Sequence, residues 1–307
     1  MEISVIIPVY NKAPYLDKCF ESIFSQRFEE FEVMAVDDGS TDGSGALCDE
    51  WGRRDERLRV IHTVNGGVTA ARRIGVEYSK GKYIMFSDAD DYFLPDALNL
   101  MHRLITETGA DEVFATYEDQ YGHRRDSGLR GFVEPERLIR DLLGVRSQFC
   151  VLWGIIFRRE LLDGCLNAPR EIVEREDSLM QIKCLMKEPR VFFTEEPAYL
   201  HFEDIPNARR ETLSWIRIYD EELRKTLQPQ WERYCSAFLL HQIKIYEKFI
   251  DCRQFHVVDY YRPLRKRLTA DIPLMDRIAL LLPPLLAYPL IHTYKKLLTM
   301  KRRRSMK

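Results

Sequence analysis

The segment ISVIIPVYNKAPYLDKCFESIFSQRFEEFEVMAVDDGS, residues 3–40, contains two apolar runs separated by one helical pattern. The runs, at 3–9 and 31–37, are short and rich in β-branched and aromatic residues, as buried strands are. Between them, apolar side chains recur at intervals of three and four residues, which predicts a helix with one apolar face. These side chains are Leu16, Cys19, Phe20, Ile23 and Phe24. A strand, a helix and a second strand in this order predict two parallel strands joined by a helix.

The same alternation continues as far as residue 117. Further strands are predicted at 58–63, 82–87 and 112–117, and further helices at 44–53, 69–79 and 95–108. This spacing predicts an α/β fold with a Rossmann-like, mostly parallel sheet and helices on both faces. We expect ligands to bind at the carboxyl ends of its strands.

Beyond residue 117 the pattern changes. Residues 118–206 are less regular, with one clear helix at 177–186, and from residue 207 the pattern is helical. We therefore expect one domain over residues 1–206, in two halves that meet at residue 117. A helical C-terminal region over residues 207–307 is expected to follow it.

The composition is that of an ordinary globular protein. Hydrophobic residues make up 45% and charged residues 31%, which excludes disordered, collagen-like and multi-span membrane proteins. None of the seven cysteines forms a CxxC pair, so neither a structural zinc site nor a disulfide framework is expected. The N-terminal apolar run is expected to be a strand and not a signal peptide.

The net charge of −2 conceals an asymmetry. From Arg262 onward the chain has twelve Lys and Arg residues against two acidic residues, a local charge of +10. The remainder carries −12. A basic tail on an acidic body favours a polyanionic partner, either nucleic acid or anionic lipid.

Two aspartates, Asp88 and Asp90, follow the apolar run at residues 83–86. On an extended segment, side chains two positions apart project to the same side, so both carboxylates can address one divalent cation. Magnesium is typically held by one or two carboxylates together with substrate phosphates, and manganese prefers the same oxygen ligands. The alternative is a solvated acidic turn that caps the following helix, which begins at Pro95.

Polar side chains also follow the first two predicted strands. Asp37 and Asp38 could accept hydrogen bonds from a nucleobase or from ribose hydroxyls, and Tyr10 could stack on a base. The alternatives are a glycine turn with Asp42 or Ser44 as a helix cap, and an aromatic ring packed on the next helix.

Five short motifs occur in a fixed order along the first hundred residues. They are residues 4–11 (SVIIPVYN), 36–42 (VDDGSTD), 65–68 (NGGV, with Ala71, Arg72 and Gly75), 80–84 (KGKYI) and 88–91 (DADD). Each motif is weak alone, but the ordered series resembles the family 2 glycosyltransferases, which have the GT-A fold. The resemblance is close over residues 3–100 and looser to about residue 200.

The resemblance implies an inverting, metal-dependent enzyme that moves a sugar from a nucleotide sugar, with UDP favoured, to an acceptor hydroxyl. Residues 1–117 would bind the donor and residues 118–206 the acceptor. The implied donor-binding residues are Pro8, Tyr10, Asn11, Asp37, Asp38, Asn65, Gly67, Arg72, Asp88 and Ala89. Asp90 and Asp88 are the implied ligands of Mn²⁺ or Mg²⁺, and His201 could complete the metal shell or be a core histidine.

An acceptor base is also implied. The segment at residues 174–177 (ERED) resembles the family's Glu-Asp motif, which makes Asp177 the candidate base, with Glu176 beside it. Such proton transfer typically contributes about 10²–10⁴-fold to the rate. The alternative is acidic capping of a helix N-terminus. Trp153 could pack at the acceptor side or in the core.

The C-terminal region contains fourteen largely apolar residues, 278–291, interrupted by three prolines. This run is shorter than the roughly 20 residues of a membrane-spanning helix. Seven basic residues follow it without an acid: Lys295, Lys296, Lys301, Arg302, Arg303, Arg304 and Lys307. An apolar segment with a polybasic tail predicts in-plane attachment to an anionic membrane surface and not nucleic-acid binding. The alternative is a helical cap on the core with a solvated tail.

These expectations together predict a cytoplasmic enzyme on the inner membrane face, with a glycan or lipid-linked glycan as acceptor in surface polysaccharide or glycolipid synthesis. Two other functions fit the same scaffold: a catalytically silent protein that binds nucleotide sugars or glycans, and a sugar-phosphate nucleotidyltransferase. The latter should have a glycine-rich basic loop where this chain has Tyr10, Asn11 and Lys12. A nicotinamide-dependent oxidoreductase is disfavoured because no GxGxxG motif follows a strand.

Overall fold

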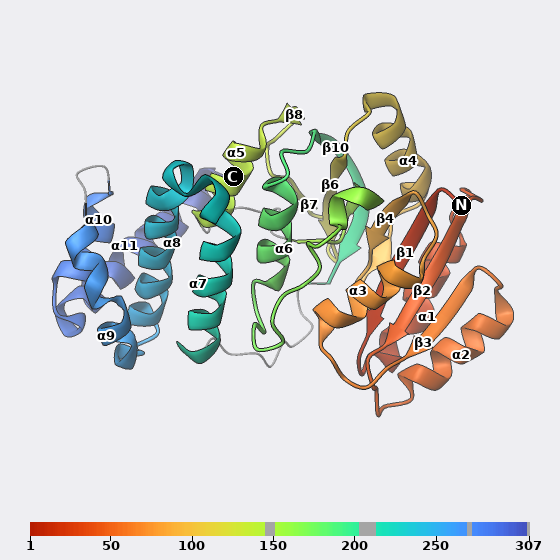
Figure 1. The fold of residues 1–307 in the computed structure, drawn as a ribbon, viewed down its shortest axis with the longest axis horizontal. Helices are drawn as coiled ribbons and strands as arrows, with labels where there is room; N and C mark the ends of the chain where they lie inside the picture. The colour runs from red at the N-terminus through yellow and green to blue at the C-terminus, as the bar shows by residue number, and fades with distance from the viewer. Residues whose placement is uncertain (145–150, 203–212, 269–271, 306–307) are drawn as a thin grey trace. The chain divides into compact units, whose positions relative to one another are not determined.

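The computed structural model describes residues 1–144, 151–202, 213–268 and 272–305, the last eight of these by their backbone alone (Figure 1). The chain forms two compact units. The first unit comprises Met1–Leu142 and Ser147–Thr226, and the second comprises Leu143–Arg146 and Leu227–Lys307. The division after Thr226 lies later in the chain than the predicted boundary at residue 206.

The first unit contains a sheet in the order β3-β2-β1-β4-β9-β6-β10-β5. Its first four strands are parallel, as predicted: β1 (Ile3–Val9), β2 (Phe31–Asp37), β3 (Leu58–His62) and β4 (Tyr83–Phe86). The strands β1, β2 and β4 are buried along almost their whole length, which explains why their sequences are apolar without strict alternation. The predicted α/β fold is confirmed.

The other half of the sheet is mixed. It consists of β5 (Tyr92–Phe93), β6 (Glu112–Asp119), β7 (Arg124–Arg125), β8 (Gly131–Val133), β9 (Ile155–Arg158) and β10 (Val191–His201). Strand β9 runs antiparallel to β4 and β6, whereas β10 runs parallel to β6. Of these strands, the sequence predicted only β6.

Helices cover both faces of the parallel half, as expected. Val5 and Ile7 of β1 share one core with residues of α1 (Ala13–Phe24), α2 (Ser44–Arg54) and α4 (Ala97–Thr108). Ile6 points to the opposite face and meets Gly75 of α3 (Val68–Tyr78), because neighbouring side chains of a strand alternate. Helix α4 begins at Ala97, after Asp96 with a φ of 65°, and not at Pro95 as predicted.

Three further helices lie beyond residue 117, where the sequence pattern is less regular. They are α5 (Pro135–Leu143), α6 (Glu176–Leu185) and α7 (Leu213–Leu227), with the short 3₁₀ helix η1 (Arg159–Leu162). Helix α6 was predicted within one residue at each end. Its first turn carries Glu176 and Asp177, which are therefore placed by the start of a helix.

The close packing of α3 on the sheet makes a prediction. An added Cβ at Gly75 would lie 2.3 Å from the Ile6 Cγ2 atom, whereas at Gly52 of α2 the nearest side-chain atom, on Val60, would be 3.5 Å away. We expect Gly75→Ala to destabilise the protein by about 1–3 kcal/mol through overpacking. We expect the matched change Gly52→Ala to stabilise it by about 0.5–1 kcal/mol, since alanine favours a helix. Urea unfolding measures both, and equal effects would contradict this packing.

The second unit is helical. Its elements are η2 (Gln228–Gln230), α8 (Trp231–Asp251), η3 (Phe255–Val257), α9 (Val258–Tyr261), η4 (Arg262–Arg267), α10 (Leu274–Leu281) and α11 (Pro284–Ser305). The predicted proline break is real at Pro283, which lies between α10 and α11, and Pro284 is the first residue of α11. At Pro289 the prediction was wrong, because this residue lies inside α11. Among the described residues, no helix is both long and apolar enough to cross a membrane.

Candidate functional site

A cavity of about 890 Å³ opens in the first unit at the carboxyl ends of β1, β2 and β4. Twelve of the residues predicted for the site line it: Pro8, Tyr10, Asp38, Asn65, Gly67, Arg72, Asp88, Ala89, Asp90, Glu176, Asp177 and His201. Parallel strands end at the same edge of a sheet, which brings these distant residues together. Asn11 and Asp37 lie beside the cavity and not in its lining.

Asn11 and Asp37, the two residues outside the lining, stabilise turns through their side chains. The Asn11 side-chain oxygen accepts a hydrogen bond from the Thr41 N–H at 2.8 Å, and Asn11 itself adopts a φ of 52°. Asp37 accepts from the Ser40 N–H at 3.0 Å and contacts His62 Nδ1 at 2.9 Å. Burial raises the pKa of Asp37, but its hydrogen bonds with Ser40 and His62 outweigh burial and lower that pKa below its usual value.

Asp38 shapes the glycine turn of the cavity. Its two carboxylate oxygens accept from the Gly66 N–H at 2.7 Å and from the Gly67 N–H at 2.8 Å. Gly67 has a φ of 90°, which favours glycine there. Asp38 is buried, so its carboxylate fixes the backbone that begins α3. In this structure, Asp38 thus orders the wall of the cavity.

Arg72 connects three elements beneath the cavity. Its guanidinium donates to Asp88 Oδ1 at 3.1 Å and also forms a short ion pair with Asp177 Oδ1. The Arg72 side chain is only 3% exposed, so its charge is neutralised locally by these carboxylates. This bridge places the end of β4 next to the first turn of α6.

The surroundings of Asp88 change the pKa of its carboxyl group. Burial raises the pKa of Asp88 to about 6; Arg72 opposes this rise, and the nearby carboxylates Asp91, Asp177 and Asp90 add to it. The carboxylates of Asp90, Asp91 and Asp177 thus lie near enough to Asp88 to form an acidic cluster at the end of β4.

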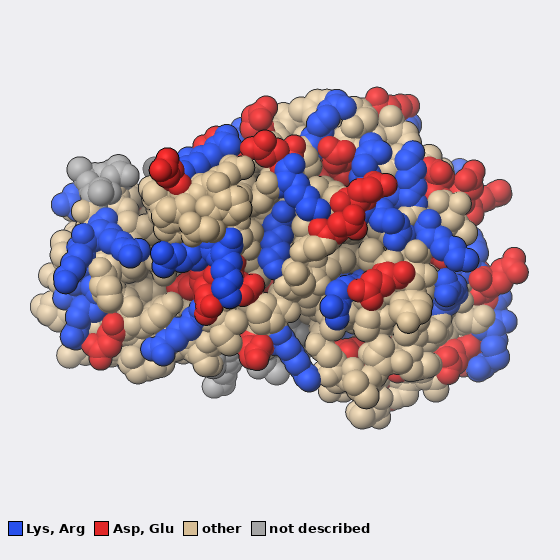
Figure 2. All heavy atoms as spheres, in the orientation of Figure 1, with Lys and Arg blue, Asp and Glu red and all other residues tan. Residues whose placement is uncertain are grey.

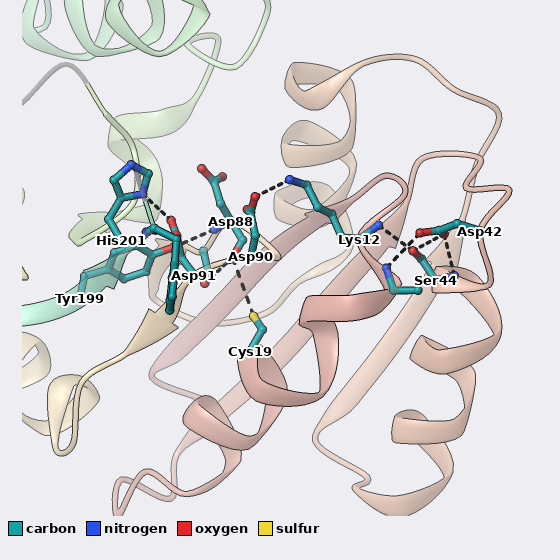
Figure 3. Close-up of polar contacts among 12 residues, drawn as sticks. Lys12, Cys19, Asp42, Ser44, Asp88, Asp90, Asp91, Tyr199 and His201 are labelled. Carbon is teal, nitrogen blue, oxygen red and sulfur yellow. Dashed lines mark hydrogen bonds and ion pairs between the residues drawn. The ribbon is translucent and has the colours of Figure 1, made fainter. Parts of the chain in front are cut away.

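Asp90 already has a cationic neighbour. The Lys12 ammonium group forms an ion pair with Asp90 Oδ2, and both side chains line the cavity (Figure 3). Within the described residues, no group of three or more His, Cys, Asp or Glu side chains could hold a metal ion. Two carboxylates, Asp88 and Asp90, fit a Mg²⁺ or Mn²⁺ site that draws its other ligands from substrate phosphates and water.

Strand β10 positions the acidic segment from the other side, as Figure 3 shows. The Tyr199 hydroxyl accepts from the Asp88 N–H at 2.9 Å, and His201 Nδ1 lies 3.0 Å from Asp91 Oδ2. Burial lowers the pKa of His201, but Asp91 outweighs burial and raises that pKa above its ordinary value. Since Nδ1 is engaged by Asp91, Nε2 is the nitrogen through which His201 could bind a cation.

Trp153 occupies the position beneath His201. Its ring stacks on His201 with centroids 4.7 Å apart and on Tyr199 at 4.9 Å. The indole is 6% exposed and belongs to the main core, so it supports the floor of the site. Of the two predicted positions for Trp153, the core position therefore matches its packing.

The sequence analysis missed four residues that shape the cavity. Tyr199 and Asp91 orient the acidic segment, Lys12 pairs with Asp90, and Arg170 donates to Asn65 Oδ1 at 2.8 Å from the segment before α6. Asp91 stood inside a quoted motif and Lys12 directly after one, so their positions were a signal. Tyr199 and Arg170 carried no recognisable pattern. Phe202, which directly follows β10, also lines the cavity.

Fold and cavity together define an α/β enzyme whose site lies at the carboxyl edge of parallel strands. The family model described as Glycosyl transferase family 2 matches residues 4–166, more than half of the chain. The chain belongs to this family and is a glycosyltransferase.

Relatives agree with this assignment. The chain is 30% identical over 234 residues to the "Uncharacterized glycosyltransferase EpsJ" of Bacillus subtilis (strain 168), covering 74% of this chain and 67% of EpsJ. It is 27% identical to the "Poly(ribitol-phosphate) beta-glucosyltransferase" of Bacillus spizizenii, covering 73% of this chain and 38% of that protein.

Solved structures share the fold. The S. aureus TarS fragment 1-349, crystallised with UDP-GlcNAc, matches with a TM-score of 0.66 and 20% identity over 96% of this chain and 92% of that fragment. The mannosyltransferase PcManGT of Pyrobaculum calidifontis, in complex with GDP-Man and Mn²⁺, matches with a TM-score of 0.54 and 17% identity over 99% of this chain and 82% of that one. The predicted GT-A fold with a C-terminal helical region is thereby confirmed.

Proposed function

We propose that the protein transfers a sugar from a nucleotide sugar, with UDP-sugars favoured, to an acceptor hydroxyl, with inversion and with a divalent cation. One observation carries the proposal: Asp88, Asp90 and Asp177 line a single cavity although α6 follows β4 by many residues. Support also comes from the fold, since relatives of this shape bind UDP-GlcNAc and GDP-Man with Mn²⁺.

The donor would lie along the strand ends. Tyr10 is 49% exposed at the cavity, so its ring is free to stack on the nucleobase. Asp88 and Asp90 would hold the cation, which supplies charge neutralisation for the departing diphosphate. The backbone of the Gly66–Gly67 turn, which Asp38 orders, leaves room for the donor to approach closely.

The acceptor would react by single displacement. The acceptor oxygen forms a bond to the anomeric carbon while the bond to the diphosphate oxygen breaks and its electron pair leaves with the nucleotide. The acceptor proton passes to the Asp177 carboxylate, which Arg72 orients. An α-linked donor then gives a β-linked product. Glu176 is the neighbouring carboxylate of the same helical turn.

The acceptor class is inferred from the proposed attachment of the enzyme to a membrane. A glycan or lipid-linked glycan in surface polysaccharide or glycolipid synthesis suits a membrane-bound enzyme. The B. spizizenii relative, whose name specifies poly(ribitol-phosphate), supports a polymeric surface acceptor.

A screen of nucleotide sugars tests the proposed reaction. We expect one UDP-sugar to raise the melting temperature in the presence of Mn²⁺ and to be hydrolysed slowly without acceptor. Tight, Mn²⁺-dependent UDP binding without hydrolysis or transfer for any donor and acceptor would favour the silent binding protein instead. Pyrophosphate release from UTP and a sugar 1-phosphate would favour the nucleotidyltransferase.

The second unit supports attachment to the membrane. On α11 the side chains of Leu286, Leu290, Tyr294 and Leu297 recur at intervals of three and four residues, and each is between 39% and 60% exposed. Ala287 and Ile291 of the same helix are buried. An amphipathic helix with an exposed apolar stripe fits a lipid interface.

Basic residues near the exposed stripe of α11 indicate what this stripe binds. Lys296 is exposed beside the stripe, and the sequence continues with Lys301, Arg302, Arg303 and Arg304. Lys and Arg side chains also gather over the part of Figure 2 that Figure 1 labels α9 to α11. We therefore assign the stripe to an anionic bilayer, at the cytoplasmic face of the membrane.

We expect the protein to float with vesicles that contain phosphatidylglycerol and to be released by salt. Leu286→Glu with Leu290→Glu should weaken vesicle binding by at least about 10²-fold, because each buried leucine contributes roughly 1.5–3 kcal/mol. Tyr78→Glu, at an exposed residue of the first unit, is the control and should not change binding. Concentration-dependent dimerisation that the leucine changes abolish, without vesicle binding, would assign the face to a second copy.

A further inference from the structure

Lys12 lies at the position where a cation is needed. Its ammonium group pairs with Asp90 across 78 residues of sequence, and the two side chains are 29% and 16% exposed (Figure 3). Both residues line the cavity, on the side where β1 and β4 end. The charge of Asp90 is thus balanced by Lys12.

The backbone around Lys12 is held in place. The Lys12 N–H donates to Ser44 Oγ at 2.8 Å, and the following Ala13 N–H donates to Asp42 Oδ2 at 3.1 Å. The preceding Asn11 is tied to the same loop through Thr41. Because the main chain is fixed on both sides of Lys12, only the flexible side chain can move away from Asp90.

Arg72, another cation of the cavity lining, cannot take over this role. Arg72 is committed to Asp88 and Asp177 and is almost fully buried. An oxygen of Asp90 that receives the Lys12 ammonium group is not free to bind a metal ion. Repulsion between an ammonium and a divalent ion is also twice that between two single charges at the same distance. A metal ion that binds Asp90 therefore competes with Lys12 for this carboxylate.

We propose that Lys12 is a resident counter-ion of Asp90 that leaves when the cation binds and then contacts the donor's diphosphate. The inference rests on the proposed function, because the metal and the donor share Asp90. A diphosphate bound to the same cation brings anionic oxygens into the cavity, and lysine is a common phosphate ligand. The donor thus offers the displaced ammonium a new partner, which couples metal binding to donor binding and discourages binding of metal alone.

Lys12→Met tests this exchange through binding, without turnover. Free Mn²⁺, measured by electron paramagnetic resonance, should show that the variant binds Mn²⁺ alone about tenfold more tightly than the unaltered protein. Calorimetry with saturating Mn²⁺ should show that the variant binds UDP about tenfold more weakly. The opposite signs distinguish the exchange from a general loss of structure.

Matched variants complete the test. Lys18→Met removes an equal charge from an exposed position of α1, the helix that follows Lys12, and should change neither affinity. Lys12→Arg keeps the charge and should retain weak binding of Mn²⁺ alone. Unchanged or weaker Mn²⁺ binding in a folded Lys12→Met protein would overturn the inference. If UDP binding to the unaltered protein proves independent of Mn²⁺, the proposed function fails, while the Mn²⁺-alone comparison still reports on Lys12.

Discussion

Asp177→Asn is expected to lower turnover by about 10²–10⁴-fold while UDP still binds in the presence of Mn²⁺. The reason is local. Asp177 lies in the first turn of α6, its side chain is 20% exposed to the cavity, and its Oδ1 atom is held by Arg72. An amide of the same shape can keep the place of the carboxylate, but it cannot accept the acceptor's proton. Initial rates at saturating acceptor and calorimetry with UDP measure the two effects separately.

The neighbouring carboxylate provides the comparison. Glu176→Gln alters the same helical turn and leaves the ion pair between Arg72 and Asp177 in place. We expect a smaller loss of turnover in this variant. If Asp177→Asn keeps its rate and Glu176→Gln loses it, the base is Glu176. A fall in melting temperature for Asp177→Asn would instead indicate that the main role of Asp177 is to neutralise buried Arg72.

The parallel half of the fold could be predicted from the sequence because its signals are local. Strands β1 and β2 were predicted with their observed ends, since each is a buried apolar run followed at once by polar residues. Strand β10 was missed. It carries Glu195, Glu196 and Pro197 in its middle, and its pairing with β6 shifts register around Pro197. Such irregular pairing interrupts the alternation by which strands are recognised.

The site was predictable to the same extent. The strand ends converge by topology, so most residues predicted from the ends of β1, β2 and β4 line one cavity. The sequence did not indicate which protein groups these residues contact. The carboxylate oxygens of Asp38 are occupied by two backbone N–H groups, and Asp88 is positioned by Tyr199 from 111 residues away. Contacts at such separations depend on the folded sheet and have no counterpart in local sequence.

Asp90→Asn is the second change with a large expected effect. We expect loss of the Mn²⁺ dependence of UDP binding and a fall in kcat/KM of about 10²–10³-fold or more, as for other removals of a group that stabilises developing charge. Asp90 is suited to this test because its side chain pairs with Lys12 and not with the buried Arg72. Asp88 would be a poorer choice, since its loss would also disturb Arg72. Calorimetry with UDP, with and without Mn²⁺, measures the dependence.

Two comparisons make the Asp90 result specific. Asp259→Asn removes the same charge from a side chain that is 83% exposed in the second unit, and it should leave donor binding unchanged. Asp90→Asn also frees Lys12, so a remaining, metal-independent affinity for UDP would come from an ammonium group that can now reach the phosphates. If the variant instead binds Mn²⁺ and UDP as tightly as the unaltered protein, the cation does not sit at the end of β4. The metal-dependent mechanism would then have to be abandoned, although the family and the fold would stand.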